Sequence, residues 1–173
     1  HRVILTYLSE NKNMVPQQPT SQNPLMSLMR QPKIYIRLPS GGQYWEPGSI
    51  DIPDNGEFPV YSMTAQDELA LKIPDALMNG QAVVDVIQHC MPDIKNAWAC
   101  PNLDLDVILI AIRIATYGEK MTVPLVIKEF EADYSLDLRL LLDQLNAQIT
   151  WDPVVPINED LTVYVRPINY RVM

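Results

Sequence analysis

Cysteine and histidine are scarce in this chain of 173 residues, which contains two of each. Cys90 and Cys100 cannot build a disulfide framework, and the paired Cys-x2-Cys spacing typical of zinc sites is absent. His89 is the only histidine in the region expected to fold, so an ordinary proton shuttle at neutral pH has one candidate. The sequence therefore predicts no catalytic residue, no cofactor and no metal ligand.

Basic residues and long apolar runs are also lacking. Lys and Arg number 13 against 21 Asp and Glu, and the net charge of -8 argues against a broad nucleic-acid surface. The longest strongly apolar run is 107–112, and it extends to Thr116 only if Arg113 is included. Even this extended run is about half the length that a bilayer span requires. No signal-peptide pattern opens the chain, and no glycine-rich phosphate loop occurs. We expect an intracellular protein that binds neither nucleic acid nor a membrane.

One alternative uses the few reactive side chains that are present. A metal-assisted hydrolase would have to recruit His89, Cys90, Asp93 and Asp104. Neighbours on a helix such as His89 and Cys90 point about 100 degrees apart, which disfavours a nucleophile and base pair. Asp104 and Asp106 stand at the start of a predicted helix, where capping and the helix dipole account for carboxylates. We interpret all of them as structural and keep the hydrolase as an alternative.

The first 31 residues are predicted to form a flexible arm. Residues 14–31 are rich in Pro, Gln, Ser and Asn, a composition typical of segments without a core. Met14 is interpreted as the natural start, and residues 1–13 as non-native or misassigned sequence. Residues 32–173 are expected to form one α+β domain that continues beyond Met173. The arm contains four candidate partner-binding residues, Leu25, Met26, Leu28 and Met29.

Extended structure is predicted on both sides of a Ser-Gly-Gly turn. Apolar and polar residues alternate over 33–38, which predicts a strand whose hairpin partner is 43–45. A second extended pair is predicted between 49–52 and 58–63. On the first hairpin, Tyr44 and Trp45 are candidate partner anchors, with packing against the helices as the alternative.

Helices are predicted in the middle of the chain, near 65–72, 74–79, 81–91 and 103–117. Thr64 is placed to cap the first of them, and Gly80 and Gly118 are placed as stops. Beyond Gly118, a hairpin of 120–127 with 130–134, a helix capped by Asp137 and a strand at 161–165 are expected. The predicted fold is α+β, with antiparallel β-hairpins at both ends of the chain around a central helical section.

Three segments together resemble one protein family. They are Gln31–Gly42 (QPKIYIRLPSGG), Met63–Gly80 (MTAQDELALK followed by PDALMNG) and Ile110–Gly118 (IAIRIATYG). Over residues 24–170 the chain resembles the baseplate hub assembly family of T-even-type contractile-tailed bacteriophages. The opening segments are similar, more loosely, to tail assembly chaperones of other contractile-tailed phages. One departure is that some family members carry a Cys-x2-Cys insertion after the Tyr-Gly segment, whereas 122–127 contains no cysteine.

This resemblance implies a non-enzymatic tail protein that takes part in baseplate hub assembly. It would bind hub or tape-measure proteins, either as a transient chaperone or as a retained baseplate component of the virion. Its location would be the host cytoplasm during assembly. A cellular adaptor protein is the alternative that involves no phage partner.

Overall fold

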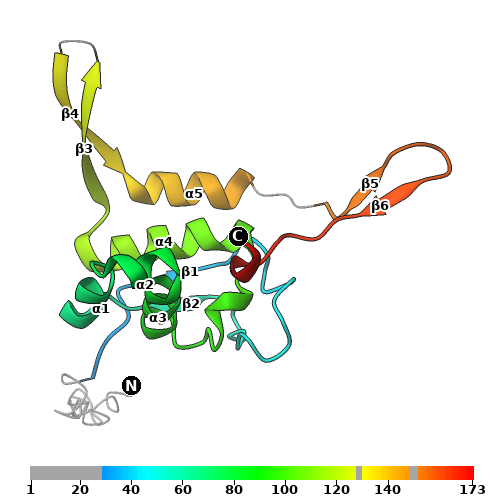
Figure 1. The fold of residues 1–173 in the computed structure, drawn as a ribbon, viewed down its shortest axis with the longest axis horizontal. Helices are drawn as coiled ribbons and strands as arrows, with labels where there is room; N and C mark the ends of the chain where they lie inside the picture. The colour runs from blue at the N-terminus through cyan, green and yellow to red at the C-terminus, as the bar shows by residue number, and fades with distance from the viewer. Residues whose placement is uncertain (1–28, 128–129, 149–151) are drawn as a thin grey trace, which may run out of the picture. The chain divides into compact units, whose positions relative to one another are not determined.

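The computed structural model describes residues 29–127, 130–148 and 152–173 and contains a helical section and three separate antiparallel strand pairs (Figure 1). Contacts between residues divide the chain after Arg30, and these helices and strands all belong to the unit Gln31–Met173. Helices and antiparallel pairs occur together, so the fold is α+β, as the sequence predicts.

The first strand pair differs from the predicted hairpins. β1 (Ile34–Ile36) pairs with β2 (Phe58–Val60), so its partner is neither 43–45 nor any part of 49–52. Residues 39–48 form turns, and Ile50 makes an isolated bridge to Ile94. Both predicted pairings are therefore wrong. Alternation identified the strand at 34–36, but contacts far apart in the sequence chose its partner.

The predicted helices are confirmed to within two residues at each end. They are α1 (Ala65–Ala70), α2 (Pro74–Met78), α3 (Gln81–Cys90) and α4 (Asn102–Tyr117), with the short 3-10 helix η2 (Ala97–Ala99) before α4. Thr64 caps α1 as predicted, in a capping box with Asp67. Gly80 has φ of 77°, a left-handed conformation that lets the chain leave α2 and enter α3 at once.

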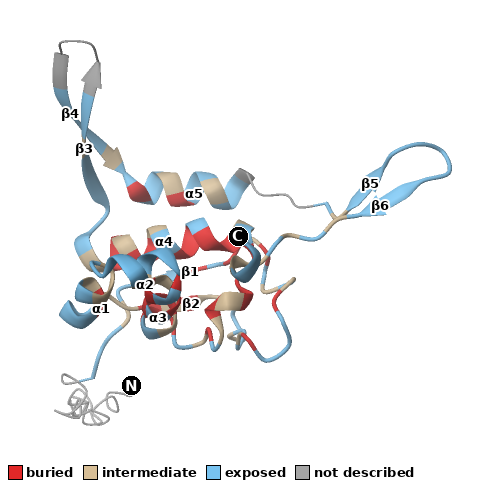
Figure 2. Cartoon of the chain, viewed as in Figure 1, coloured by how far each residue is buried: buried red, intermediate tan, exposed pale blue. Residues whose placement is uncertain are grey.

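The core is centred on α4, as its apolar stripe predicts (Figure 2). Val107, Ile108 and Ala111 are fully buried on this helix. Phe58 of β2 and Ile87 of α3 belong to the same core cluster. Burial on several sides explains why apolar residues continue nearly all round α4.

A long hairpin leads from α4 into the last helix. β3 (Lys120–Ile127) pairs antiparallel with β4 (Phe130–Asp137), and α5 (Leu138–Gln148) follows directly. Asp137 caps α5 as predicted, because its Oδ1 accepts from the N–H groups of Arg139 and Leu140 at 3.0 and 3.1 Å. Leu138 and Leu142, one turn apart, are buried in the core. These two side chains fasten α5 to the body.

A second hairpin and a final 3-10 turn complete the chain. β5 (Val154–Pro156) pairs with β6 (Thr162–Tyr164), and η3 (Tyr170–Val172) follows. The predicted strand at 161–165 is confirmed, whereas β5 was not predicted. The Tyr170 N–H donates to the Cys100 carbonyl, and its ring stacks on Trp98 at 5.5 Å. The end of the described chain thus packs against the start of α4.

Candidate functional site

A buried carboxylate, Asp104, joins the turns at 39–48 to α4. Its oxygens accept from the backbone N–H of Ser40 at 2.8 Å, from the Ser40 hydroxyl, and from the Trp45 indole N–H at 2.8 Å. Asp104 is completely buried. Burial raises the pKa of its carboxyl, although the hydrogen bonds from Ser40 and Trp45 oppose the rise.

This cluster corrects the interpretation of Trp45. Trp45 is buried in the core, so its prediction as an exposed partner anchor is wrong. Tyr44 is half-buried and has φ of 67°, in a run of turns rather than on a hairpin strand. Helix dipole alone also fails to explain Asp104, which holds a segment some sixty residues away. A buried indole N–H needs an acceptor, and this requirement was the only feature of the sequence that indicated a partner for Trp45.

A second polar pair joins α1 to α3. His89 Nδ1 lies 2.8 Å from both carboxylate oxygens of Asp67, which also forms the capping box with Thr64. Burial alone would raise the pKa of Asp67, but hydrogen bonds from Thr64 and His89 outweigh it, and the pKa is lowered. The pair is structural, because it fixes the start of α1 against the end of α3.

The residues of the hydrolase alternative do not converge. Among the described residues, no group of three or more His, Cys, Asp and Glu side chains is arranged to hold a metal ion. Cys90 is completely buried, and Asp104 is occupied by Ser40 and Trp45. Burial, followed by the nearby Asp104 carboxylate, raises the pKa of the Cys100 thiol, which makes this thiol a poor nucleophile.

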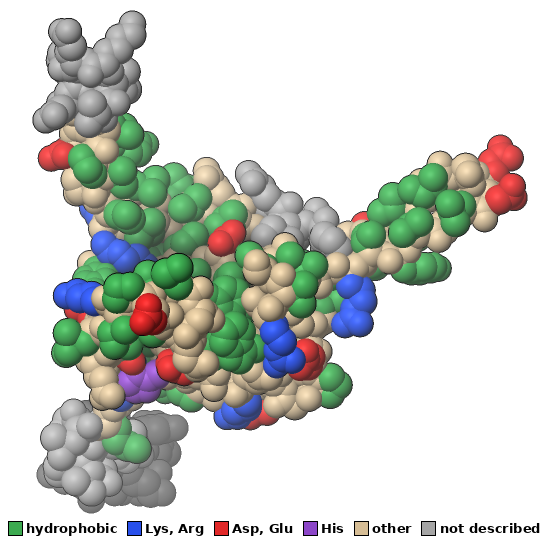
Figure 3. Space-filling model, viewed as in Figure 1, with side chains coloured by type: hydrophobic (Ala, Val, Ile, Leu, Met, Phe, Trp, Pro, Cys, Tyr) green, Lys and Arg blue, Asp and Glu red, His purple; other side chains and the backbone are tan. Residues whose placement is uncertain are grey.

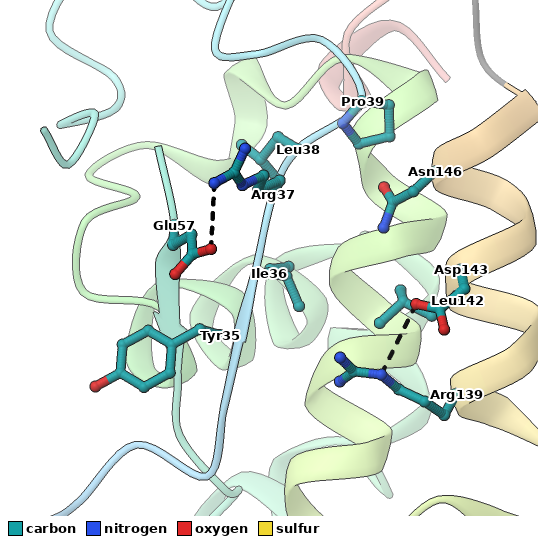
Figure 4. A pocket seen from close by; sticks show the side chains of 10 residues that line it. All are labelled: Tyr35, Ile36, Arg37, Leu38, Pro39, Glu57, Arg139, Leu142, Asp143 and Asn146. Atoms are coloured by element: carbon teal, nitrogen blue, oxygen red, sulfur yellow. Dashed lines mark hydrogen bonds and ion pairs between the residues drawn. The ribbon is translucent and has the colours of Figure 1, made fainter. Parts of the chain in front are cut away.

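The surface of the described residues is hollowed in at least two places. A cleft of about 380 Å³ lies between β1 and α5, and its rim carries the ion pairs Arg37–Glu57 at 3.3 Å and Arg139–Asp143 at 3.8 Å (Figure 4). Each of these cations already faces a carboxylate, so the rim does not select for a ligand of either charge. The other hollow, of about 120 Å³, is lined by α3, α4 and the residues Met63 and Leu71 on either side of α1, and it is smaller than ordinary ligand pockets.

The β3–β4 hairpin carries an unusual exposed apolar face. Its register places Met121 opposite Leu136, Val123 opposite Tyr134 and Leu125 opposite Ala132, and directly opposite residues share one face. We call these six residues the hairpin face. Tyr134 is 56% exposed, and Met121 and Leu125 are also exposed, whereas Leu136 is partly buried against the core. The opposite face carries polar residues such as Thr122, Ser135 and Asp133.

The β5–β6 hairpin is exposed along both strands (Figures 2 and 3). Its exposed apolar side chains are Val154, Val155, Ile157, Leu161, Val163 and Tyr164. The charged residues of its loop are both acidic, Glu159 and Asp160. Sequence reasoning missed both hairpins as candidate binding surfaces, because alternation predicts an apolar face without saying whether the body covers it.

The candidate residues of the arm fall at the edge of the described chain. Leu25, Met26 and Leu28 lie outside the described residues, and Met29 is 62% exposed. They stay a prediction. No helix in the described part of the chain is long and apolar enough to cross a membrane.

Searches against protein-family models, curated proteins and solved structures found no match to this chain.

Proposed function

We propose that this chain is a non-enzymatic protein of contractile-tail assembly that binds baseplate hub or tape-measure proteins. The tail assignment rests on the resemblance of the segments Gln31–Gly42, Met63–Gly80 and Ile110–Gly118. The binding mode rests on one structural observation, the exposed hairpin face of β3–β4. The protein acts in the host cytoplasm, either released as a chaperone or retained in the baseplate.

The hairpin face has the character of a binding surface. An antiparallel pair with one apolar and one polar face normally places the apolar face against a core. Here Met121, Leu125 and Tyr134 are exposed instead. Contiguous exposed apolar residues beside polar ones are typical of protein interaction sites, and Tyr is enriched among residues that dominate binding energy.

The three resembling segments also meet in the fold. The Met63 N–H, in the second segment, donates to the Thr116 hydroxyl of the third at 3.0 Å. β1, in the first segment, packs against α4. Segments spread over 31–118 therefore build one neighbouring part of the body, which supports treating them as a single unit.

Affinity capture through this protein tests the proposal directly. The captured proteins are identified by mass spectrometry from infected-cell lysate and from purified phage particles. Hub or tape-measure proteins recovered from lysate alone support the chaperone form, and their recovery from particles supports the retained form. Recovery of host proteins without tail proteins would overturn the proposal in favour of a cellular adaptor.

The binding surface is tested with two matched double variants of the same hairpin. Leu125→Ser with Tyr134→Ser removes apolar contacts from the hairpin face, and we expect tail-protein affinity to fall about tenfold or more. Thr122→Ala with Ser135→Ala truncates the opposite, polar face and is expected to leave capture unchanged. Equal capture by both double variants would show that the hairpin face is not the site.

A further inference from the structure

The hydrogen bonds within the β5–β6 hairpin show which backbone N–H and C=O groups point away from the partner strand. The Val165 N–H donates to the Pro153 carbonyl at 2.8 Å, and the Ile157 N–H donates to the Leu161 carbonyl at 2.9 Å. Val155 lies opposite Val163 between these pairs. Because hydrogen-bonded pairs alternate along an antiparallel ladder, odd-numbered residues bond inside the hairpin and even-numbered residues point outward.

The outer edge of β5 is closed to a further strand. Pro156 points outward and has no N–H group, and the outward N–H of Val154 already donates to Asp152 Oδ1 at 2.9 Å. Proline and local side-chain bonds are known means of blocking edge pairing. On β6 the outward residues are Thr162 and Tyr164, and both have an N–H to donate. β6 is therefore the open edge of the hairpin.

The hairpin also exposes an apolar face. Cross-strand pairing puts Val155 and Val163 on one face, and alternation adds Ile157 and Leu161 to it. All four side chains are exposed. A two-stranded hairpin is marginally stable by itself in water, and further strands beside it supply the missing stability.

We propose that β6 pairs antiparallel with β6 of a second copy of this chain, with Val163 on the two-fold axis. Thr162 then lies opposite the second copy's Tyr164, and the outward N–H and C=O groups of both residues bond across the axis. The result is a four-stranded sheet in the order β5, β6, β6, β5. This self-association goes beyond tail-protein binding and does not depend on it.

Charge complementarity selects both the second copy and this register. With Val163 on the axis, continuing the register past the ends of β6 brings Asp160, in the bend before the strand, to the side of Arg166 of the other copy, and symmetry repeats the pair. Both residues are exposed. Moving the axis by one residue places Asp160 opposite Tyr164 or Ile168 instead. Attraction between these two opposite charges, one beyond each end of β6, favours the Val163 register over its neighbours.

Sedimentation velocity of the purified full chain tests the pairing. The native chain is expected to be a dimer in the micromolar range, and Thr162→Pro, which removes an outward N–H of β6, is expected to be a monomer. Val154→Pro is the matched control, since it changes the outer edge of β5 in the same hairpin, and it should stay dimeric. A monomeric native chain, or a dimer that tolerates Thr162→Pro, overturns the proposal.

Charge exchange tests the register with substitutions at exposed positions that leave folding intact. Asp160→Lys and Arg166→Glu alone should each raise the dimer dissociation constant about tenfold, because each creates two like-charge pairs. The double variant should return close to the native value. Failure of the double variant to recover would refute the Val163 register.

Affinity capture separates this proposal from the proposed function. A monomeric chain that still captures tail proteins overturns self-association alone. If the native chain is monomeric and Thr162→Pro loses a tail protein, the β6 edge belongs to that partner and the second copy is excluded.

Discussion

Replacing Asp104 by alanine is expected to cost more stability than any other single truncation of a polar side chain in the described chain. The substitution removes hydrogen bonds from the Ser40 N–H, the Ser40 hydroxyl and the Trp45 indole. Bonds to a carboxylate contribute about 1.5–3 kcal/mol each, and the donors left behind are buried. Relief of the burial that raises the pKa of Asp104 offsets part of this loss. We expect a net destabilisation of about 2–4 kcal/mol.

Urea unfolding at pH 7, followed by far-ultraviolet circular dichroism, measures this loss. Trp45→Phe removes one of the three donors and replaces the indole by a smaller apolar ring, so it should cost about 1–2 kcal/mol. Asp106→Ala is the control, because Asp106 is exposed on the same helix and should change stability by less than about 0.5 kcal/mol. If Asp104→Ala and Asp106→Ala unfold at the same urea concentration, the network does not hold the turns at 39–48 against α4.

Asp67→Asn should destabilise at neutral pH, because the pKa of Asp67 is lowered in the folded state. Urea unfolding from pH 7 to pH 3 measures the free energy of unfolding of both chains. The difference between them should persist above about pH 4 and disappear as the pH falls through the pKa of Asp67 in the folded chain. The pKa of Asp104 is raised in the folded state, so protonation at lower pH favours the folded chain. The native chain should therefore gain stability over Asp104→Asn as the pH falls from neutral toward about 4. A difference in stability that does not change with pH would contradict this. Gly80→Ala should cost about 1–2 kcal/mol in thermal unfolding, because φ is 77° and the new Cβ would lie 3.0 Å from the Tyr170 hydroxyl. Gly56→Ala, with φ of 69° and no atom within 4 Å of the new Cβ, measures the backbone part of that cost, and equal losses would exclude the Tyr170 contact.

Local chemistry predicted most elements of the fold. Four predicted features each depend on residues within a few positions of one another. They are the Thr64 cap, the stop at Gly118, the apolar stripe of α4 and the Asp137 cap. β5 was missed because it is three residues long, follows Pro153 and ends at Pro156, which hides its alternation. The short length of β5 and the two prolines at its ends are local features, so this miss does not come from distant contacts.

Pairing over long distances could not be predicted in the same way. β1 takes β2 as its partner across more than twenty residues, and Trp45 finds its acceptor Asp104 across 59 positions. A strand presents the same alternation to any partner, and a buried indole accepts any nearby carboxylate. Which of them meet depends on how α4 and the turns at 39–48 pack together.

The sequence by itself determined the helices, their ends, the α+β class and the absence of the paired ligands that a zinc site needs, because caps, periodicity and composition act locally. Only the tertiary structure decided that Trp45 is buried, that the apolar face of β3–β4 is exposed and that β6 rather than β5 has the open edge. The physical reason is that exposure and hydrogen-bond satisfaction belong to the packed chain, where each group either meets a distant partner or stays at the surface.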